Sequence, residues 1–377
     1  MRRLKLTQKL VLSFLSILVS YFLISWILYH KPFDKHGLTN TDGHRGKSSI
    51  QTALQGTLYD NEKRENRQQD RILDFETEKN FFTTRSSIIN PLNHSLLISP
   101  RDFCGNDVTI LIVVLSEFTN LVRRKTIRNT WASTLEKPEG VRIAFIFGQQ
   151  SAKKWNDRLE EESQKYQDII KYDFPDIYSN LILKSLSILR WATDHCKNVN
   201  FVMKVDDDVF IMTSRLHSYF ERLYPKRILR GHYNAHYTVL RDGKWLVTRD
   251  QYPFSEFPPY IAGGAYIMSL DVAETLFEAA KRVPLLPIED AFITGILAKI
   301  TGITIFSDGQ FLTQFAHENL EIQSTICSKS YGSVLAILLG APDEHSISKL
   351  MLLVNKCYRE VQRLQALYGP KPPWRQH

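Results

Sequence analysis

The chain has 377 residues, of which 43% are hydrophobic and 23% charged, a composition typical of a globular protein with room for one large domain and appended segments. Its formal net charge of +8 would suit a nucleic acid, an acidic membrane surface or an anionic small substrate. No block of lysines and arginines is interleaved with aromatic residues, so we set nucleic acid aside as a partner.

The first predicted element is a membrane anchor at residues 10–29. Leu10 to Tyr29 is an uncharged apolar run of the roughly 20 residues that a bilayer-spanning helix needs. The basic residues of the tail 1–9 predict that this tail is cytosolic and that the rest of the chain is lumenal. A cleaved signal peptide is the alternative, but the run exceeds the usual apolar core of about 7–15 residues and no small-residue cleavage site follows.

Residues 30–103 are predicted to form a largely disordered stem. The sequence there is polar and shows neither strand alternation nor a sustained helical stripe of apolar residues. Such a segment would hold a catalytic domain away from the membrane. A single N-x-S/T sequon, Asn93-His94-Ser95, lies near its end, where glycosylation would be unobstructed.

Residues 104–377 are predicted to form a lumenal domain of the α/β class, with helices flanking a mostly parallel sheet. Short apolar runs alternate there with helical segments. Expected strands are Thr109–Ser116, Arg142–Gly148, Asp168–Phe174 and Phe201–Val205, and expected helices are Leu121–Trp131, Ala152–Tyr166 and Asn180–Asp194. Ligands of such sheets bind at the carboxyl ends of the strands. The tail from about Ser330 is expected to be helical.

The four cysteines, Cys104, Cys196, Cys327 and Cys357, all lie on the side that is expected to be oxidising, and none has C-x-x-C spacing. Disulfides are therefore expected. Of the three pairings we prefer Cys104 with Cys196, because both precede predicted buried strands. Buried free thiols are the alternative.

Three carboxylates, Asp206-Asp207-Asp208, directly follow the apolar strand that carries Lys204. Like charges crowded at a strand end are costly without a counter-ion. A hard divalent cation such as Mg²⁺ or Mn²⁺ would offset the repulsion and could still bind diphosphate oxygens. The triplet therefore predicts a metal site, and a solvated acidic turn is the alternative.

A second acidic pair, Glu289-Asp290, opens the helical run AFITGILAKI. One reading makes this pair a helix start, where the exposed amides favour acidic residues. The other makes one of the two a general base, because an inverting transfer to a hydroxyl needs a carboxylate that takes the proton of that hydroxyl.

Basic and glycine-rich segments complete the set of candidate binding residues. Arg124 and Arg128 are four residues apart, so they share a helix face on which they could grip a phosphate or form an ordinary solvated surface. Gly263 and Gly264 allow the backbone to approach a ligand closely, and the aromatics around them suit either stacking on a sugar or packing into the core.

Five motifs in order, RRKTIRNTW, DFPDIYSNLILK, FVMKVDDDVF, KWLVTRDQYPFSEFPPYIAGGAYIMS and EDAFITG, resemble those of the β-1,3-glycosyltransferases of the galactosyltransferase family. The resemblance covers roughly Thr109 to Gln314. It implies a GT-A nucleotide-sugar-binding fold, a type II Golgi membrane protein, a UDP-galactose or UDP-N-acetylhexosamine donor, an Mn²⁺ or Mg²⁺ cofactor, and an acceptor glycan on a glycoprotein or glycolipid.

The resemblance also implies roles for individual residues. Asp206 and Asp208 would bind the metal, with Asp208 as the principal ligand, and Asp290 would be the catalytic base. The UDP-sugar would be bound by Arg124, Arg128, Asp173, Asn180, Lys184, Lys204, Asp206, Asp207, Gly263 and Gly264.

The sequence departs from the family in one place. Members usually carry a metal-binding histidine shortly before a proline near the C-terminus, and the corresponding position here, counted back from Pro342, is Leu338. His317 is the candidate replacement. A relative that lost catalysis and acts as a glycan-binding or chaperone-like Golgi protein is therefore the alternative to an active enzyme.

Overall fold

The computed structural model describes residues 76–77, 80–82, 86–134, 140–312 and 334–339, with short stretches between 348 and 367. The chain divides into two compact units, Met1–Gln68 and Gln69–His377, and all described residues belong to the second. The expected anchor at residues 10–29 therefore lies outside the described part of the chain. Within that part, no helix is both long enough and apolar enough to cross a membrane.

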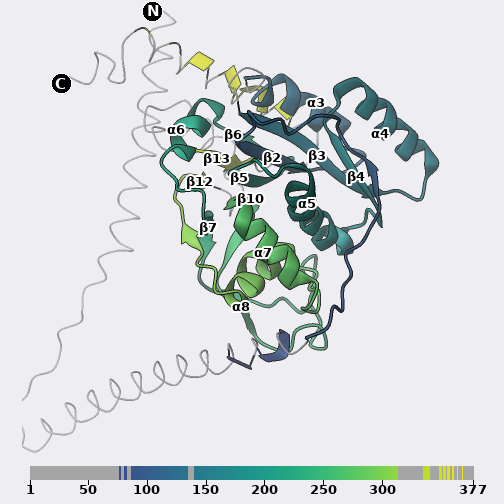
Figure 1. The fold of residues 1–377 in the computed structure, drawn as a ribbon, viewed down its shortest axis with the longest axis vertical. Coiled ribbons are helices and arrows are strands. Elements are labelled where there is room, and N and C mark those ends of the chain that lie inside the picture. Colours follow the sequence, from purple (N-terminus) through teal and green to yellow (C-terminus); the bar gives the residue numbers. More distant parts are fainter. Residues whose placement is uncertain are drawn as a thin grey trace, which may run out of the picture. The chain divides into compact units, whose positions relative to one another are not determined.

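An eight-stranded mixed sheet forms the framework of the described unit (Figure 1), in the order β1-β4-β3-β2-β5-β10-β7-β11. Its four parallel strands are β2 (Ile110–Leu115), β3 (Val141–Gln149), β4 (Ile169–Pro175) and β5 (Phe201–Asp206). The helices between them are α3 (Leu121–Asn129), α4 (Lys153–Tyr166) and α5 (Leu181–His195). Each element agrees with its predicted range, which confirms the α/β class.

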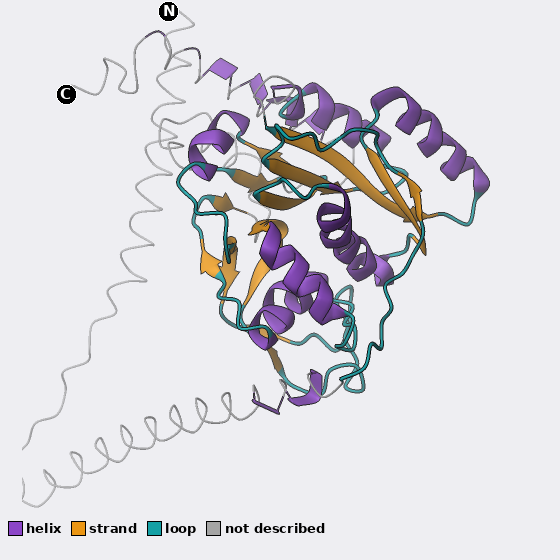
Figure 2. Ribbon diagram, viewed as in Figure 1, coloured by secondary structure: helices purple, strands orange, loops and turns teal. Residues whose placement is uncertain are grey.

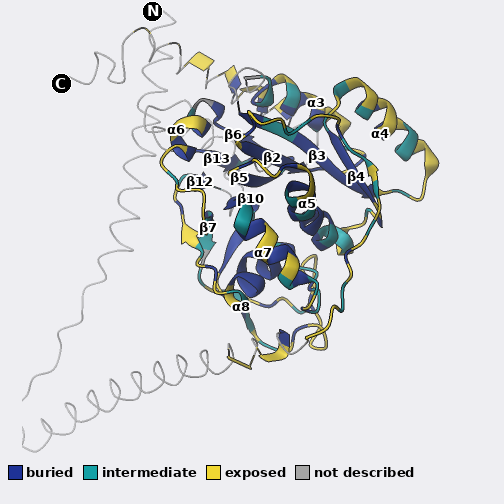
Figure 3. Ribbon diagram, viewed as in Figure 1, coloured by how far each residue is buried: buried dark blue, intermediate teal, exposed yellow. Residues whose placement is uncertain are grey.

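The parallel strands are continuous apolar runs because both faces of the sheet are covered, as Figure 2 shows. In β2 the alternate residues Leu111, Val113 and Leu115 pack in one hydrophobic cluster with residues of α5 and of α7 (Leu270–Ala280). Ile110 and its alternate neighbours pack in a second cluster with residues of α3 and α4. In Figure 3 these strands are accordingly buried, whereas α4 turns one face to solvent.

The second half of the sheet is mainly antiparallel, so the sheet is mixed and the prediction of a mostly parallel sheet was wrong for this half. β10 (Tyr260–Ser269) pairs antiparallel with β5 and with β7 (Leu229–Asn234), and β11 (Phe306–Ser307) follows parallel to β7. Smaller sheets join β12 (Phe311–Leu312), β13 (Ala336–Leu338) and β6 (Val209–Ile211), and β8 (Tyr237–Thr238) with β9 (Glu256–Phe257). The remaining elements are η1 (Ala132–Thr134), η2 (Tyr178–Asn180), η3 (Thr213–Arg215), α6 (Leu216–Phe220), the π-helix η4 (Ala291–Leu297) and α8 (Ala298–Ile300).

Two segments differ from their predictions. The end of the expected stem is part of the fold, since β1 (Leu96–Ile98) pairs antiparallel with β4 and Phe82 is buried against Tyr252. In the tail, residues 336–338 form strand β13 rather than a helix, because their apolar side chains are buried where β13 pairs with β6. The described residues between 348 and 367 are helical, as predicted. The stem segment is polar with only a few apolar residues, and the tail segment is a short apolar run. Neither pattern predicts a strand pairing before the partner strand is known.

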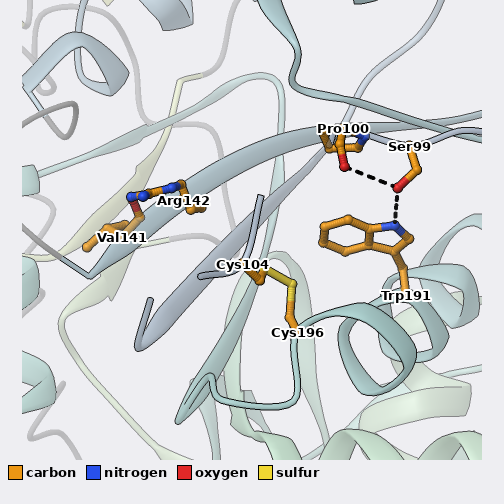
Figure 4. The surroundings of a disulfide bond; sticks show 7 residues. All are labelled: Ser99, Pro100, Cys104, Val141, Arg142, Trp191 and Cys196. Atoms are coloured by element: carbon orange, nitrogen blue, oxygen red, sulfur yellow. Dashed lines mark hydrogen bonds between the residues drawn. A yellow bond between two sulfur atoms is a disulfide. The ribbon is translucent and has the colours of Figure 1, made fainter. Parts of the chain in front are cut away.

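Cys104 and Cys196 form a disulfide, as preferred from the sequence (Figure 4). The bond links the loop before β2 to the end of α5, with 5.1 Å between the Cα atoms and a sequence separation of 92. Beside it, the indole N–H of Trp191 donates to Ser99 Oγ at 3.2 Å. Cys327 and Cys357 lie outside the described residues.

Replacing both bonded cysteines by serine should destabilise the protein by about 2–5 kcal/mol, because the unfolded chain would lose the constraint of a long closed loop. Thermal unfolding of the double variant and of each single variant would measure this loss. The two single variants should match the double one, whereas an unchanged midpoint in all three would show that the bond contributes nothing to stability.

Candidate active site

The order of the parallel strands locates a crevice between β2 and β5. The chain moves outward from β2 to β3 and β4, and then returns to place β5 on the other side of β2. At such a reversal the connections leave in opposite directions, so a crevice opens at the carboxyl ends of the two strands. Ser116 follows β2 there, and Asp206 ends β5.

The three aspartates of the triplet have different environments. Asp207 is buried and accepts hydrogen bonds from Ser116 Oγ at 2.8 Å, Asn120 Nδ2 at 2.9 Å and Arg123 Nη1 at 2.9 Å. Its carboxylate therefore ties the turn after β5 to the end of β2 and to the start of α3. Asp206 is the more open one, with 38% of its side chain exposed.

Lys204 connects the triplet to the second acidic pair. Its ammonium group lies 2.7 Å from Asp206 Oδ1 and 2.9 Å from Glu289 Oε1, and it also donates to the carbonyl of Gly263. Burial opposes the positive charge, but the two carboxylates outweigh burial and raise the pKa of Lys204. The lysine is thus held charged between the two acidic groups, which β5 and the start of η4 bring together.

Asp290 lies next to Glu289 at the N-terminus of η4. One oxygen accepts from the amide of Ala291 at 2.9 Å, and the amide of Gly263 also donates to this carboxylate. Burial and then the charge of Glu289 raise the pKa of Asp290 to about 7, against the opposing effect of Lys204. A carboxylate with that pKa can accept a proton at neutral pH and hold it.

Gly263 makes this approach of carboxylate to backbone sterically feasible. A Cβ atom at Gly263 would lie 3.0 Å from Asp290 Oδ2 and 3.3 Å from Glu289 Oε1. The strand β10 is irregular here, because its register against β7 shifts between Ile261 and Tyr266, the interval that contains Gly263 and Gly264. Such bulges commonly re-aim a strand beside an active site.

Asp206 and Asp208 are the residues at this strand end that could hold a divalent cation. Asp208 Oδ1 is buried and accepts no hydrogen bond from the described residues. Burial, and then the charge of Asp207, raise the pKa of Asp208 to about 6. Within the described ranges no three acidic, histidine or cysteine side chains form a complete metal site. Two carboxylates with substrate phosphates suffice for Mg²⁺-type ions.

Leu338 lies where the sequence placed it, next to the triplet. It stands opposite Val209 in the pairing of β13 with β6, and the amide of Leu339 donates to the carbonyl of Asp208 at 2.9 Å. A leucine offers no ligand atom, so this strand adds packing rather than coordination at residue 338. His317 lies outside the described residues, and its role as a ligand stays a prediction.

A pocket of about 340 Å³ opens beside the crevice, at the carboxyl ends of β2, β3 and β4. Lys184 lines it and is buried, with its ammonium group 2.7 Å from Asp176 Oδ1 and 3.0 Å from the carbonyl oxygen of Ser116. The other oxygen of Asp176 accepts from the amide of Gly148 at 2.9 Å. This pair therefore joins three strand ends around the pocket, whose apolar walls include Phe118 and Trp155.

Arg124 and Arg128, which were expected to bind the nucleotide-sugar, form ion pairs with carboxylates of this chain. Arg124 is 2% exposed and binds Glu162 with two hydrogen bonds of 2.9 and 2.8 Å. Arg128 binds Asp168 in the same way, at 2.7 and 2.9 Å, and also lies 2.8 Å from Glu162. The structure directs both guanidinium groups to carboxylates that connect α3 with α4 and β4, and Arg124 also donates to Ser116 Oγ at 3.2 Å at the border of the crevice.

Asp173 and Asn180 also face local partners. Asp173 Oδ1 accepts from the amide of Ser95 at 2.8 Å, which fastens the end of β1 to β4. Asn180 Nδ2 donates to the carbonyl of Pro175 at 2.9 Å in the turn before α5. Of the residues expected around the nucleotide, Lys184, Lys204, Asp206, Asp207 and Gly263 therefore border the crevice or its pocket, and Arg124 reaches that border through Ser116.

Comparison with known proteins identifies the family. Residues 122–308 match the Galactosyltransferase family. The chain is 33% identical over 240 residues to mouse "Beta-1,3-galactosyltransferase 1", an alignment covering 61% of this chain and 72% of that one. The chain belongs to the β-1,3-glycosyltransferase family. It is a UDP-sugar glycosyltransferase, and nucleotide-sugar chemistry accounts for a crevice that joins carboxylates to a neighbouring pocket.

Other relatives of this glycosyltransferase differ in the sugar that their names give. It is 33% identical over 59% of its length to zebrafish (Danio rerio) "Lactosylceramide 1,3-N-acetyl-beta-D-glucosaminyltransferase B", and covers 63% of that protein. It is 32% identical over 219 residues to the rat "UDP-GlcNAc:betaGal beta-1,3-N-acetylglucosaminyltransferase 7", an alignment covering 55% of each chain. A solved glycosyltransferase involved in glycosylation of the major capsid of PBCV-1 aligns with a TM-score of 0.35 at 10% identity, too weak a likeness for a conclusion.

Three residues of this glycosyltransferase site were missed from the sequence. Asp176 was passed over for Asp173, although it lies just after the end of β4, where a parallel sheet binds ligands. Ser116, directly after β2, carries the same positional signal. Tyr178, which lines the pocket in the turn before α5, gave no signal beyond its presence in the DFPDIYSN motif.

Proposed function

We propose that this enzyme transfers galactose or an N-acetylhexosamine from a UDP-sugar to the 3-hydroxyl of an acceptor glycan, with inversion, to form a β-1,3 linkage on a glycoprotein or glycolipid. The proposal rests on one observation, that Lys204 contacts Asp206 on one side and Glu289, the neighbour of Asp290, on the other. Lys204 thereby holds Asp206, the carboxylate proposed for the diphosphate, close to the acidic pair that contains Asp290, the carboxylate proposed for the acceptor.

In the proposed reaction, the uridine occupies the pocket beside Lys184 and the diphosphate lies toward Asp206 and Asp208. Those two carboxylates would hold Mn²⁺ or Mg²⁺, which supplies charge neutralisation to the UDP leaving group. Asp290 takes the proton of the acceptor hydroxyl while the oxygen of that hydroxyl forms the bond to the anomeric carbon. Because attack comes from the side opposite to UDP, an α-linked donor gives a β-linked product.

A donor screen tests this function. The full chain would be incubated with Mn²⁺, a β-galactoside or β-N-acetylglucosaminide acceptor, and in turn UDP-galactose, UDP-N-acetylglucosamine and UDP-N-acetylgalactosamine, with UDP release as the readout. We expect one donor to give acceptor-dependent UDP release that EDTA abolishes. No acceptor-dependent release with any pair, or release unaffected by EDTA, would contradict the proposed metal-dependent transfer.

We also propose that the enzyme is a type II protein of the Golgi membrane, with its catalytic domain in the lumen. The anchor-like run at residues 10–29 motivates this, and Asn93 of the sequon is exposed in the described structure. In a eukaryotic cell, the full chain should therefore carry an N-glycan at Asn93. Removal of the glycan by peptide N-glycosidase should shift the electrophoretic mobility of the wild type and of Ser95→Thr. It should not shift the mobility of Asn93→Gln or Ser95→Ala. An unglycosylated wild type would count against lumenal placement.

A further inference from the structure

Two exposed aromatic side chains are grouped around Lys244 at the edge of the pocket proposed for the nucleotide, and the acceptor has so far been given no binding residues. Tyr178 is 50% exposed and comes from the turn between β4 and α5. Trp245 is 54% exposed and comes from the loop between β8 and β9. Lys244, its neighbour in the chain, lies between them, and we call these three residues the aromatic rim.

The rim is organised although it is exposed. Tyr178 and Trp245 come from two loops that are far apart in the sequence, and Lys244 links them. The ammonium group of Lys244 lies 5.4 Å from the ring centroid of Tyr178 and 5.6 Å from that of Trp245, within the range of cation–π attraction. The two rings are thus held in place before any ligand arrives, which lowers the entropic cost of binding one.

The rim lies within electrostatic reach of the proposed base. Burial, and then the charges of Asp290, Asp206 and Glu289, raise the pKa of the Tyr178 hydroxyl. Tyr178 also lines the pocket proposed for the nucleotide. One edge of the rim therefore borders the donor side, and the exposed remainder faces the solvent from which an acceptor must come.

Exposed aromatics that are grouped around an ammonium group suit one kind of ligand particularly well. A hexopyranose ring presents a face of C–H groups that packs on an aromatic ring, while its hydroxyls at the edge need polar partners. The rim offers two aromatic rings and an ammonium group for such hydroxyls. An apolar peptide would leave Lys244 without a partner, and a bare phosphate would leave the rings unused.

We propose that Tyr178 and Trp245 form the platform on which the acceptor hexopyranose of the proposed transfer stacks, with Lys244 as a donor to its hydroxyls. This inference rests on the proposed function and adds the residues that select the acceptor. Stacking there would hold a ring hydroxyl toward Asp290, whereas the donor nucleotide would remain in its pocket.

Separate KM values for donor and acceptor in the full-length enzyme test the platform. Trp245→Ala should raise KM for methyl β-D-galactopyranoside or N-acetyllactosamine about tenfold, the size expected for one lost aromatic contact. KM for the UDP-sugar should stay within about twofold of the wild-type value. Trp245→Phe should keep most of the acceptor affinity because it keeps a ring. Tyr224→Ala, which removes another exposed aromatic (76% exposed), is the matched control and should change neither KM.

Two results would overturn the platform: an unchanged acceptor KM in Trp245→Ala, or a rise confined to the donor KM. Should the wild type transfer to no acceptor, the proposed function itself would fail. The platform would then be judged by saturation-transfer NMR of methyl β-D-galactopyranoside on the UDP-loaded protein. We expect the signal to be lost in Trp245→Ala but kept in Tyr224→Ala, and equal signals in the wild type and Trp245→Ala would refute the platform.

Discussion

Replacing Asp290 by asparagine should lower kcat by about 10²- to 10⁴-fold while leaving UDP binding intact, because general-base catalysis contributes that much to a proton transfer. The amides of Ala291 and Gly263 that bond Asp290 can still find an oxygen acceptor in the asparagine side chain. The substitution therefore removes the basic group with little change in shape. Single-turnover transfer and UDP titration would measure the two quantities separately.

The pH dependence of the wild type should report the same group. Asp290 accepts a proton only when it is ionised, and its pKa lies at about 7, so kcat/KM should fall as the pH drops below 7. In Asp290→Asn this limb should move to lower pH, where Asp208, with a pKa of about 6, still has to ionise. Asp250→Asn, at an exposed aspartate outside the cluster, should behave as the wild type does. A wild-type profile that is flat from pH 5.5 to 8 would argue against Asp290 as the base.

Replacing Lys204 by methionine should cost about 3–5 kcal/mol of stability, the usual penalty for leaving buried charges unpaired. Lys204 is 3% exposed and neutralises both Asp206 and Glu289, which belong to separate elements. Without it, the start of η4 and the end of β5 would bring only negative groups together. Thermal unfolding followed by tryptophan fluorescence at pH 7.5 would measure the loss.

Two further variants make the Lys204 prediction specific. The double change Lys204→Met with Glu289→Gln should recover part of the lost stability, since one of the two unpaired carboxylates is then neutral. Lys197→Met, at an exposed lysine that follows α5, should be nearly neutral. A Lys204→Met protein as stable as the wild type would mean that the acidic cluster does not need this counter-ion.

The sequence predicts the parallel half of the sheet well because its signals are local. A strand buried on both faces is an apolar run, and the helices between such runs are long enough to show their period. The DDD triplet and the Glu289-Asp290 pair stand out for the same reason, since charged groups next to apolar runs need an explanation. Their meeting around Lys204 depends on the pairing of β5 with β10, which no single segment encodes.

The residues that sequence patterns placed less well are those whose role depends on a partner. The guanidinium group of Arg124 could bind a phosphate, but it forms an ion pair with Glu162, 38 residues away in the chain. The motif DFPDIYSN alone does not tell whether Asp173 or Asp176 faces the ligand. The structure shows that Asp173 bonds the amide of Ser95 beside β1, whereas Asp176 pairs with Lys184 at the pocket. The aromatic rim likewise requires two loops to meet, so spacing along the chain could not reveal it.

The linkage of the product is the most direct measurement of the central claim. The full-length enzyme would be supplied with ¹³C-labelled UDP-galactose or UDP-N-acetylglucosamine, Mn²⁺ and a β-linked acceptor, and the purified product analysed by NMR. We predict a new anomeric centre in the β configuration, joined to carbon 3 of the acceptor ring. An α-configured product, a bond to another carbon, or free sugar released by hydrolysis alone would contradict an inverting transfer through Asp290.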